Sequence, residues 1–295
     1  MIHCETTALG VLLRHEGVEL SEPMTFGLGE GLGFVYWDAR NLDVPFLGGR
    51  TKPLEITRTL TARLGLDLHV QQTRSPRAAW RTVVAGLGSG RPVGLQLDSY
   101  HLEYFPIKVH FPGHVAAIHG YDDTHAYLID TAGEVTTSLD SLAAARPARN
   151  LSFTIAGTAR PDLGAAIRGA VRRNAQTFLT PPIANVGYRG IATAARRIPR
   201  AGGDLSTVAM LMEHGGTGGA LFRNLYRDFL AESVTIVDDH RLRRGHELFA
   251  AIAPRWTAVA ARLADGAVAE AADLLAALAE QEREAMETLA GVDAG

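Results

Sequence analysis

Hydrophobic positions in the first half of the chain alternate between helical and strand-like spacing. Leu9, Leu12 and Leu13 recur on one helix face, and Gly17 can take the left-handed conformation that ends a helix. Residues 46–50, Phe-Leu-Gly-Gly-Arg, are expected to form a tight loop. Similar patterns predict a short helix that begins at Ser21 and helices over residues 53–65 and 75–88. They predict strands over residues 34–37, 66–72, 92–98, 114–120, 126–130 and 150–156.

The pattern changes near residue 158. Beyond it strand signals stop, and apolar residues keep helical spacing, as Leu274, Leu275 and Leu278 do in the tail. We therefore predict an α+β N-terminal domain, residues 1–158, followed by an all-helical C-terminal domain, residues 159–295.

Charge is unevenly distributed over the helical part. Residues 160–200 hold eight arginines against one acid, Asp162, a net charge of +7, whereas residues 265–293 hold eight acids against Arg283, a net charge of −7. Two interpretations stay open. The two stretches form solvated faces that attract one another, or the arginine-rich face docks an acidic partner.

Composition narrows the protein class. Apolar residues make up 46% and charged residues 21%, the net charge is −3, and no run of about 18 apolar residues occurs. We expect a soluble protein that binds neither nucleic acid nor membrane. A single cysteine cannot form an internal disulfide, and no secretory signal pattern opens the sequence, so the expected location is the cytoplasm.

That cysteine, Cys4, lies at the predicted start of the first helix. Backbone N–H groups and the positive end of the helix dipole favour a thiolate there, and a thiolate is the form that attacks an acyl carbonyl. The alternative is that Cys4 is a small buried hydrophobic residue.

A strand–turn–strand unit supplies the groups that activate a cysteine. If Gly120 pairs with Ala126, His114 and Asp130 are diagonal neighbours on one face of the hairpin. A one-residue slip would favour His119 instead, and Asp130 could simply end its strand. In the favoured register, His114 takes the thiol proton of Cys4 and Asp130 orients the imidazole. The backbone N–H of Cys4 is an expected oxyanion donor.

The loop with Gly27, Gly29, Gly31 and Gly33 has two interpretations. The glycines allow a chain reversal with positive φ, or they hold the backbone close to a substrate. No Lys-Ser/Thr follows, so a phosphate-binding P-loop is excluded. His110 and His114 are four residues apart but lack an acidic helix partner, and we predict no metal and no cofactor.

Several motifs resemble the family of butirosin biosynthesis protein H. They are His3-Cys4 with Thr7-Ala8-Leu9, Phe26-Gly-Leu-Gly-Glu-Gly-Leu-Gly-Phe34, Phe46-Leu-Gly-Gly-Arg50, Asp98-Ser-Tyr-His-Leu-Glu-Tyr104, His110-Phe-Pro-Gly-His114, Gly120-Tyr-Asp-Asp123 and Gly218-Gly-Ala-Leu-Phe-Arg-Asn-Leu-Tyr-Arg-Asp-Phe-Leu230. The last resembles the helical domain that accompanies this family. The resemblance implies a papain-like, cysteine-peptidase-type N-terminal domain with Cys4 as nucleophile, His114 as base and Asp130 as orienting residue.

The implied activity is amide-forming acyl transfer in natural-product biosynthesis. An acyl or aminoacyl group would pass from the phosphopantetheine thioester of an acyl or peptidyl carrier protein, through Cys4, to a small-molecule amine. The expected substrate-binding residues are Gly31, Gly33, Tyr36, Asp98 and Tyr100. A homo-oligomer stays open.

The chain departs from the expected motifs at two points. Asp130 precedes Thr131 where the family pattern has Asp-Pro, and residues 1–3 lack the glutamine that papain-type enzymes use as an oxyanion donor. Three other functions are compatible with the same residues: a cysteine peptidase or amidase, a non-catalytic binding module, and an N-terminal-nucleophile hydrolase formed by removal of Met1 to His3.

Overall fold

The computed structural model describes residues 2–40, 42–106, 108–158 and 162–293, in two compact units. The first unit comprises Met1–Thr25 and Pro53–Pro161, and the second comprises Phe26–Lys52 and Asp162–Gly295. The chain passes from the first unit to the second within α2 (Glu22–Leu28).

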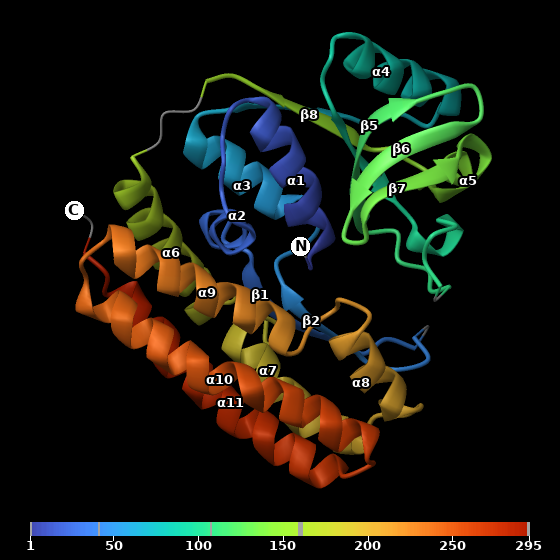
Figure 1. Cartoon of the computed structure of the whole chain (residues 1–295). Coiled ribbons are helices and arrows are strands. Elements are labelled where there is room, and N and C mark those ends of the chain that lie inside the picture. Colours follow the sequence, from blue (N-terminus) through green and yellow to red (C-terminus); the bar gives the residue numbers. More distant parts are fainter. Residues whose placement is uncertain (1, 41, 107, 159–161, 294–295) are drawn as a thin grey trace. The chain divides into compact units, whose positions relative to one another are not determined.

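The first unit combines helices with one antiparallel sheet (Figure 1). Its elements are α1 (Cys4–His15), α3 (Glu55–Leu64), β3 (Asp67–Gln71), α4 (Pro76–Gly88), β4 (Val93–Leu97), η1 (Ser99–His101), β5 (His114–Tyr121), β6 (His125–Asp130), β7 (Gly133–Ser138), α5 (Leu139–Ala145) and β8 (Ser152–Ala156). The strand order is β3-β8-β4-β5-β6-β7, so the last strand in sequence lies between β3 and β4.

Helices pack on this sheet through buried apolar side chains. Leu9, Leu12 and Leu13 of α1 are almost fully buried, and α1 runs along β5 with α3 beside it (Figure 1). A separate core, which includes Val83 of α4 and Leu142 of α5, covers side chains of β4, β5 and β6. Gly17 has a φ of 75°, which confirms the predicted end of the first helix.

The β5–β6 hairpin sets the register that the site depends on. Ala117 pairs with Ile129, the pairing that the sequence predicts near the site, but Gly120 pairs with Tyr127 rather than with Ala126. The prediction was wrong at the turn because a bulge lies between Ile118 and Gly120.

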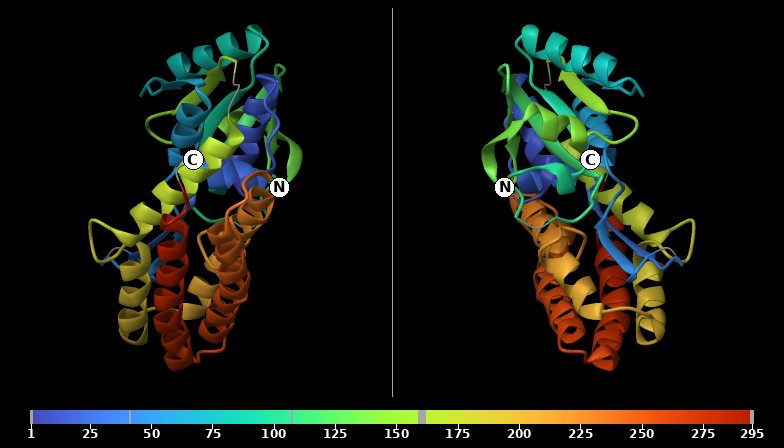
Figure 2. Two further views of the ribbon diagram at one scale, coloured as in Figure 1. Left: turned by 90° about the vertical axis from the view of Figure 1, so that its left-hand side faces the viewer. Right: turned by 90° about the vertical axis from the view of Figure 1, so that its right-hand side faces the viewer.

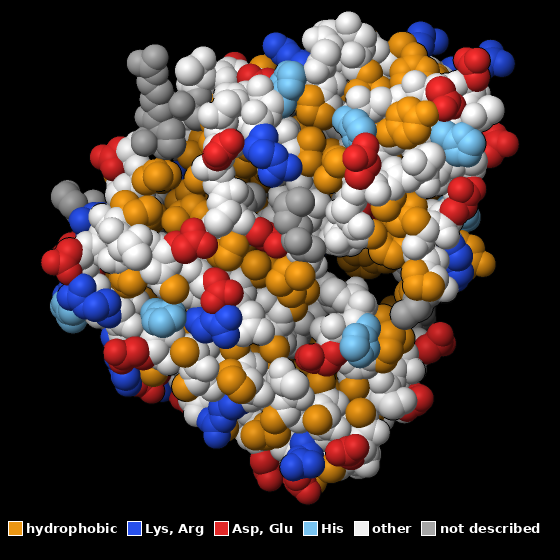
Figure 3. All heavy atoms as spheres, viewed as in Figure 1, with side chains coloured by type: hydrophobic (Ala, Val, Ile, Leu, Met, Phe, Trp, Pro, Cys, Tyr) orange, Lys and Arg blue, Asp and Glu red, His pale blue; other side chains and the backbone are white. Residues whose placement is uncertain are grey.

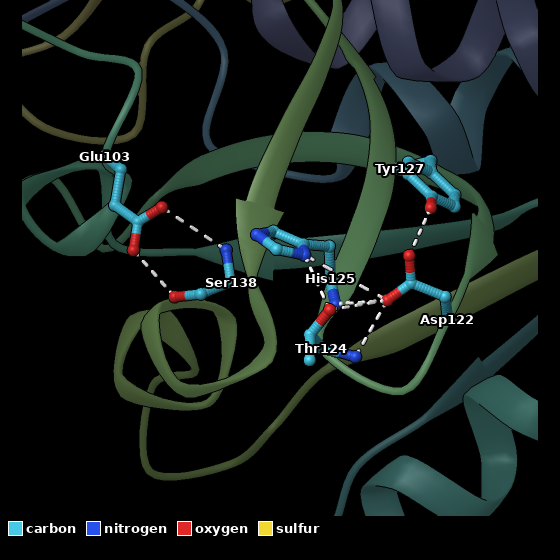
Figure 4. A network of polar contacts seen from close by, with 6 residues as sticks. All are labelled: Glu103, Asp122, Thr124, His125, Tyr127 and Ser138. Carbon is cyan, nitrogen blue, oxygen red and sulfur yellow. Dashed lines mark hydrogen bonds and ion pairs between the residues drawn. The ribbon is translucent and has the colours of Figure 1, made fainter.

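Side-chain hydrogen bonds stabilise the turn between β5 and β6, and others anchor the connection that leads into β5 (Figure 4). The carboxylate of Asp122 accepts from the N–H groups of Thr124 and His125, both at 2.7 Å, and from the hydroxyl of Tyr127. Glu103 accepts from the hydroxyl of Ser138 at 2.6 Å, which ties the connection between β4 and β5 to the start of α5.

The second unit is a helical bundle with a two-stranded hairpin (Figure 2). Its elements are β1 (Leu32–Trp37), β2 (Phe46–Arg50), α6 (Leu163–Leu179), α7 (Gly187–Arg197), η2 (Ile198–Arg200), α8 (Leu205–Glu213), α9 (Ala220–Ile236), α10 (His240–Ala264) and α11 (Val268–Ala290). The long helices α10 and α11 pack against one another, and α7 packs on both α11 and β1.

A fully buried ion pair lies in the centre of this bundle. Arg223 of α9 donates two hydrogen bonds of 2.8 Å to the carboxylate of Glu282 on α11 and a third, of 3.0 Å, to the carbonyl of Gly49 on β2. The indole N–H of Trp256 donates to the same carboxylate, and the guanidinium lies over the Trp256 ring. One network therefore joins the three helices α9, α10 and α11 to the hairpin.

The chain turns at Gly29 and Glu30, before this hairpin, but Gly27 and Gly31 serve close packing and do not supply the positive φ. The positive φ of the turn falls on Glu30, at 54°, whereas an added Cβ at Gly27 would meet the ring of Phe229 and one at Gly31 the ring of Phe26. Residues 46–50 pair with β1 as a strand and are not the predicted loop, and Gly48 and Gly49 make room there for neighbouring side chains.

Oppositely charged stretches of the helical unit lie close together. The arginine-rich helices α6 and α7 both pack against the acidic α11, and acidic and basic side chains alternate over the face of this unit in Figure 3. The surface ion pairs are mostly local, such as Arg283 with Glu280 and Glu287. Arg160 of the arginine-rich stretch lies outside the described residues.

The structure confirms an α+β chain with a helical C-terminal region, while the papain-like assignment stays a prediction. The two predicted domains, 1–158 and 159–295, differ from the observed units in residues 26–52, which group with the helices. The predicted boundary adjoins residues 159–161, which lie outside the described residues, as does Met1. No helix among the described residues has both the length and the apolar character needed to cross a membrane.

Replacing Arg223 by Met should lower the free energy of unfolding by about 3–5 kcal/mol, because Glu282 would keep a buried charge without its cation. The double variant Arg223→Met/Glu282→Met should recover part of this loss. Urea denaturation measures both, with the exposed Arg283→Met on α11 as the control, expected to match the wild type. Equal stability of Arg223→Met and the wild type would contradict this account of the bundle.

Candidate active site

Cys4 is the first residue of α1, and its side chain is buried. The preceding residue, His3, makes no side-chain capping bond, and the carboxylate of Glu22 instead holds the backbone just before the helix. It accepts from the N–H groups of Ile2 at 3.0 Å and His3 at 2.8 Å and from the hydroxyl of Thr6. A residue of the following helix therefore fixes the backbone immediately before the cysteine.

A second carboxylate anchors the same turn of α1 from inside the unit. Glu5 is fully buried and accepts from the N–H groups of Leu54 and Thr57 and from the Thr57 hydroxyl, at 3.0–3.1 Å. These groups form the start of α3, where Leu54 has a φ of 69°. The carboxylate satisfies helix N–H groups that have no partner within the helix, and it joins the starts of α1 and α3.

His114 begins β5 and lies between the cysteine and Asp130. Its Nε2 is 2.6 Å from Oδ2 of Asp130, the last residue of β6, and its side chain is hydrogen-bonded to Cys4 as well. Because Nε2 faces Asp130, Nδ1 is the nitrogen left for the sulfur. We call Cys4, His114 and Asp130 the Cys–His–Asp cluster; all three belong to the first unit.

His119, which a slipped register would favour, lies elsewhere. Its side chain is partly exposed and forms an ion pair of 3.4 Å with Glu134 of β7. The observed register therefore brings His114, and not His119, to Asp130.

The electrostatics of the Cys–His–Asp cluster favour a charged imidazole. Burial alone would lower the pKa of His114, but the negative charge of Cys4 and the hydrogen bond to Asp130 outweigh it. The bond to Cys4 and the charge of Asp130 act in the same direction, and together they raise the pKa of His114 to about 10. With its pKa raised this far, the imidazole is charged at neutral pH, and a charged imidazole favours ionisation of a neighbouring thiol.

Asp130 is held as a carboxylate by three donors. It accepts from His114 and from the hydroxyl of Tyr104 at 2.6 Å, both on Oδ2, and from the N–H of Thr131 at 2.6 Å on Oδ1. Burial raises the pKa of Asp130, but the bond to His114, the charge of that ring and the other two bonds lower it by more. The proline expected at position 131 has no N–H and could not make the bond that Thr131 makes.

Tyr104 is the site residue that the sequence did not assign. It lies in the connection between β4 and β5, and burial followed by the charge of Asp130 raises the pKa of its hydroxyl. The neighbouring Phe105 packs edge-on against the His114 ring, with 5.2 Å between ring centroids. Sequence spacing could not assign Tyr104, because its contact depends on how a 16-residue connection folds back.

Two predicted substrate-binding residues, Asp98 and Tyr100, begin this connection. Asp98 accepts from the N–H groups of Tyr100 and Phe111, and its Oδ2 is 2.8 Å from Nδ1 of His110. Burial raises the pKa of Asp98, whereas the bond from His110 and the two backbone bonds lower it by more. Tyr100 is partly exposed and stacks on the His110 ring at 3.9 Å.

Asp98, His101 and His110 also each offer one ligand atom, and these atoms lie within 4.8 Å of one another. Carboxylate and imidazole groups are ligands that zinc accepts, so these are the described residues that could hold a metal. The expectation of no metal stays a prediction.

The other three predicted substrate-binding residues, Gly31, Gly33 and Tyr36, belong to the second unit. Gly33 and Tyr36 lie on β1, and an added Cβ at Gly33 would approach the backbone of Arg50. Tyr36 is fully buried; burial, with the charge of Asp38 and a bond to it, raises the pKa of its hydroxyl to about 12 against the opposing charge of Arg197. Their contact with a substrate stays a prediction.

The fold and this cluster define a class of protein: an α+β chain whose single cysteine, at a helix start, is hydrogen-bonded to a histidine–aspartate pair. The family model for the N-terminal part of butirosin biosynthesis protein H matches residues 3–131, and that of a domain of unknown function (DUF4872) matches residues 139–289, just over half of the chain. No curated protein matches it. The chain belongs to the butirosin biosynthesis protein H-like family, as its motifs predict, and membership implies a biosynthetic enzyme in natural-product metabolism.

The pH dependence of Cys4 alkylation tests the ion pair. Because the pKa of His114 is raised to about 10, the imidazolium persists below that pH and is lost only as the pH rises through it. We expect the iodoacetamide rate constant to be nearly flat from pH 7 to 9. In His114→Ala it should be about thirtyfold lower at pH 7, where about 3% of an unassisted thiol is ionised, and it should rise near pH 8.5, the pKa of such a thiol. A wild-type rate that rises near pH 8.5 would contradict the ion pair.

The three bonds to Asp130 predict a ranking of variants. Asp130→Asn should slow alkylation at pH 7 by about tenfold, because it removes the charge that favours the imidazolium. Tyr104→Phe should slow it less, since only one bond to the carboxylate is lost. Tyr127→Phe is the matched control: its hydroxyl also donates to a carboxylate, that of Asp122 at the hairpin turn, and the rate should not change. A larger effect from Tyr127→Phe than from Tyr104→Phe would contradict the role given to Tyr104.

Proposed function

We propose that this chain is a cysteine-dependent acyltransferase. It takes an acyl or aminoacyl group from the phosphopantetheine thioester of a carrier protein and transfers it to an amine, which forms an amide. The observation that carries the proposal is the buried His114 side chain, hydrogen-bonded to both Cys4 and Asp130, with its pKa raised to about 10. The family motifs and the helix-borne cysteine beside a strand-borne histidine support a papain-type architecture.

The first half-reaction forms an acyl-enzyme. The thiolate of Cys4 attacks the thioester carbonyl, and the N–H of Cys4 at the start of α1 stabilises the oxyanion. The N–H groups of Ile2 and His3 already donate to the carboxylate of Glu22, so we do not assign them to the oxyanion. As the tetrahedral intermediate collapses, the C–S bond to phosphopantetheine breaks, and the His114 imidazolium protonates the departing thiolate to the thiol, which leaves His114 neutral.

The second half-reaction uses the same groups in the opposite sense. The acceptor amine attacks the acyl group on Cys4, and the neutral His114 takes a proton from the nitrogen. The C–S bond to Cys4 breaks, the amide leaves, and the thiolate–imidazolium pair is restored. Asp130, held by Tyr104 and Thr131, keeps the imidazole ring in one orientation through both steps.

Intact-protein mass spectrometry tests this cycle. The full chain is incubated with carrier proteins that bear acetyl and aminoacyl thioesters, with and without an amine. We expect a mass increase of one acyl group, absent in Cys4→Ala, that disappears with amide formation when the amine is added. Asp130→Asn should lower the transfer rate by about a hundredfold or more.

The other outcomes identify the competing functions. Release of free acid at every amine concentration would indicate a hydrolase, and the proposal would be rejected in favour of a peptidase or amidase. No adduct and no turnover with any of these thioesters, together with slow alkylation of Cys4 at neutral pH, would indicate a non-catalytic binding module.

A further inference from the structure

A cavity of about 210 Å³ lies in the first unit, away from the residues of the Cys–His–Asp cluster. Side chains of α4, β4 and α5 form most of its walls, among them Trp80, Val83, Leu95 and Leu142. Two polar residues, Arg146 and Asn150, complete the lining. The cavity therefore combines an apolar body with one cationic group.

Arg146 directly follows α5, and its guanidinium is incompletely paired. Its Nη2 donates to the carbonyl of Asn150 at 2.5 Å, but Nη1 is buried and has no hydrogen-bond partner among the described residues. Burial lowers the pKa of Arg146 to about 10. A buried cation without an anion is unfavourable, so the cavity favours a ligand that brings the missing negative charge.

The side chain of Asn150 is already engaged elsewhere, because its Nδ2 donates to the carbonyl of Thr73 at 3.1 Å. One guanidinium is thus the main polar group that a ligand would meet. A planar carboxylate matches the donors of a guanidinium, whereas a phosphate would bury more negative charge than one cation offsets.

The walls and the volume restrict the rest of the ligand. A cavity of about 150 Å³ lined by apolar side chains holds benzene, so this cavity suits a compound of about eight non-hydrogen atoms. Apolar walls select a hydrocarbon body. We propose that the cavity binds a small apolar monocarboxylic acid, with its carboxylate on Arg146 and its hydrocarbon part between α4 and α5.

This site is separate from the proposed acyl transfer, and it depends on different residues. It is nevertheless linked to the sheet that carries the cluster. Leu95 lies on β4 two residues before Leu97, which pairs with His114. A bound acid would therefore pack on the strand next to β5.

Isothermal titration calorimetry of the full-length protein with hexanoate and with 1-hexanol tests the proposal. Both probes have the same hydrocarbon chain length, but only hexanoate carries a charge. We expect hexanoate to bind the wild type at least tenfold more tightly than it binds Arg146→Met. The affinity for 1-hexanol should be similar in both proteins, which also shows that the variant keeps a folded cavity.

Two further variants locate the site. Ala79→Leu fills the cavity from α4 and should weaken both probes at least tenfold, whereas Arg149→Met, which removes an exposed arginine three residues away, should change neither. Equal binding of hexanoate to wild type and Arg146→Met, or no heat from hexanoate at millimolar concentrations, would overturn the proposal. Unchanged hexanoate binding in Ala79→Leu would place the acid elsewhere and overturn it as well.

Discussion

The arrangement around Cys4 depends on one buried carboxylate, that of Asp130. A charge with almost no contact with water is stable only when donors surround it, and here an imidazole, a phenol and a backbone N–H all point at it. These donors come from β5, from the connection before it, and from the turn after β6. Satisfying Asp130 therefore fixes the position of His114, and His114 in turn meets the sulfur at the start of α1.

Sequence reasoning located the groups of the Cys–His–Asp cluster, because helix starts and strand alternation are local signals. It placed Cys4 at a helix start and His114 beside Asp130, although the bulge at the hairpin turn shifted the pairs nearer that turn. It missed Tyr104 and read β2 as a loop. Both errors have the same physical origin: the tyrosine contact and the role of Gly48 and Gly49 are set by tertiary packing, which no local pattern contains.

Arg223 and Arg146 both have buried guanidinium atoms, but they differ in how completely those atoms are paired. Arg223 contacts a carboxylate, a carbonyl and an aromatic ring, so its guanidinium holds elements of the helical unit together. Arg146 meets one carbonyl and an apolar cavity. The first pattern is typical of a structural group, and the second is the observation from which we propose a bound acid.

The position of β8 shows that the family-model boundary does not coincide with the boundary between the two units. This strand comes from the stretch that the second family model covers, yet it lies between β3 and β4, which the first covers. Conversely, the β1–β2 hairpin comes from the first stretch and belongs to the helical unit. A fragment ending at residue 131 would lack β7 and the interior strand β8, so the stretch that the first family model covers does not contain the complete sheet.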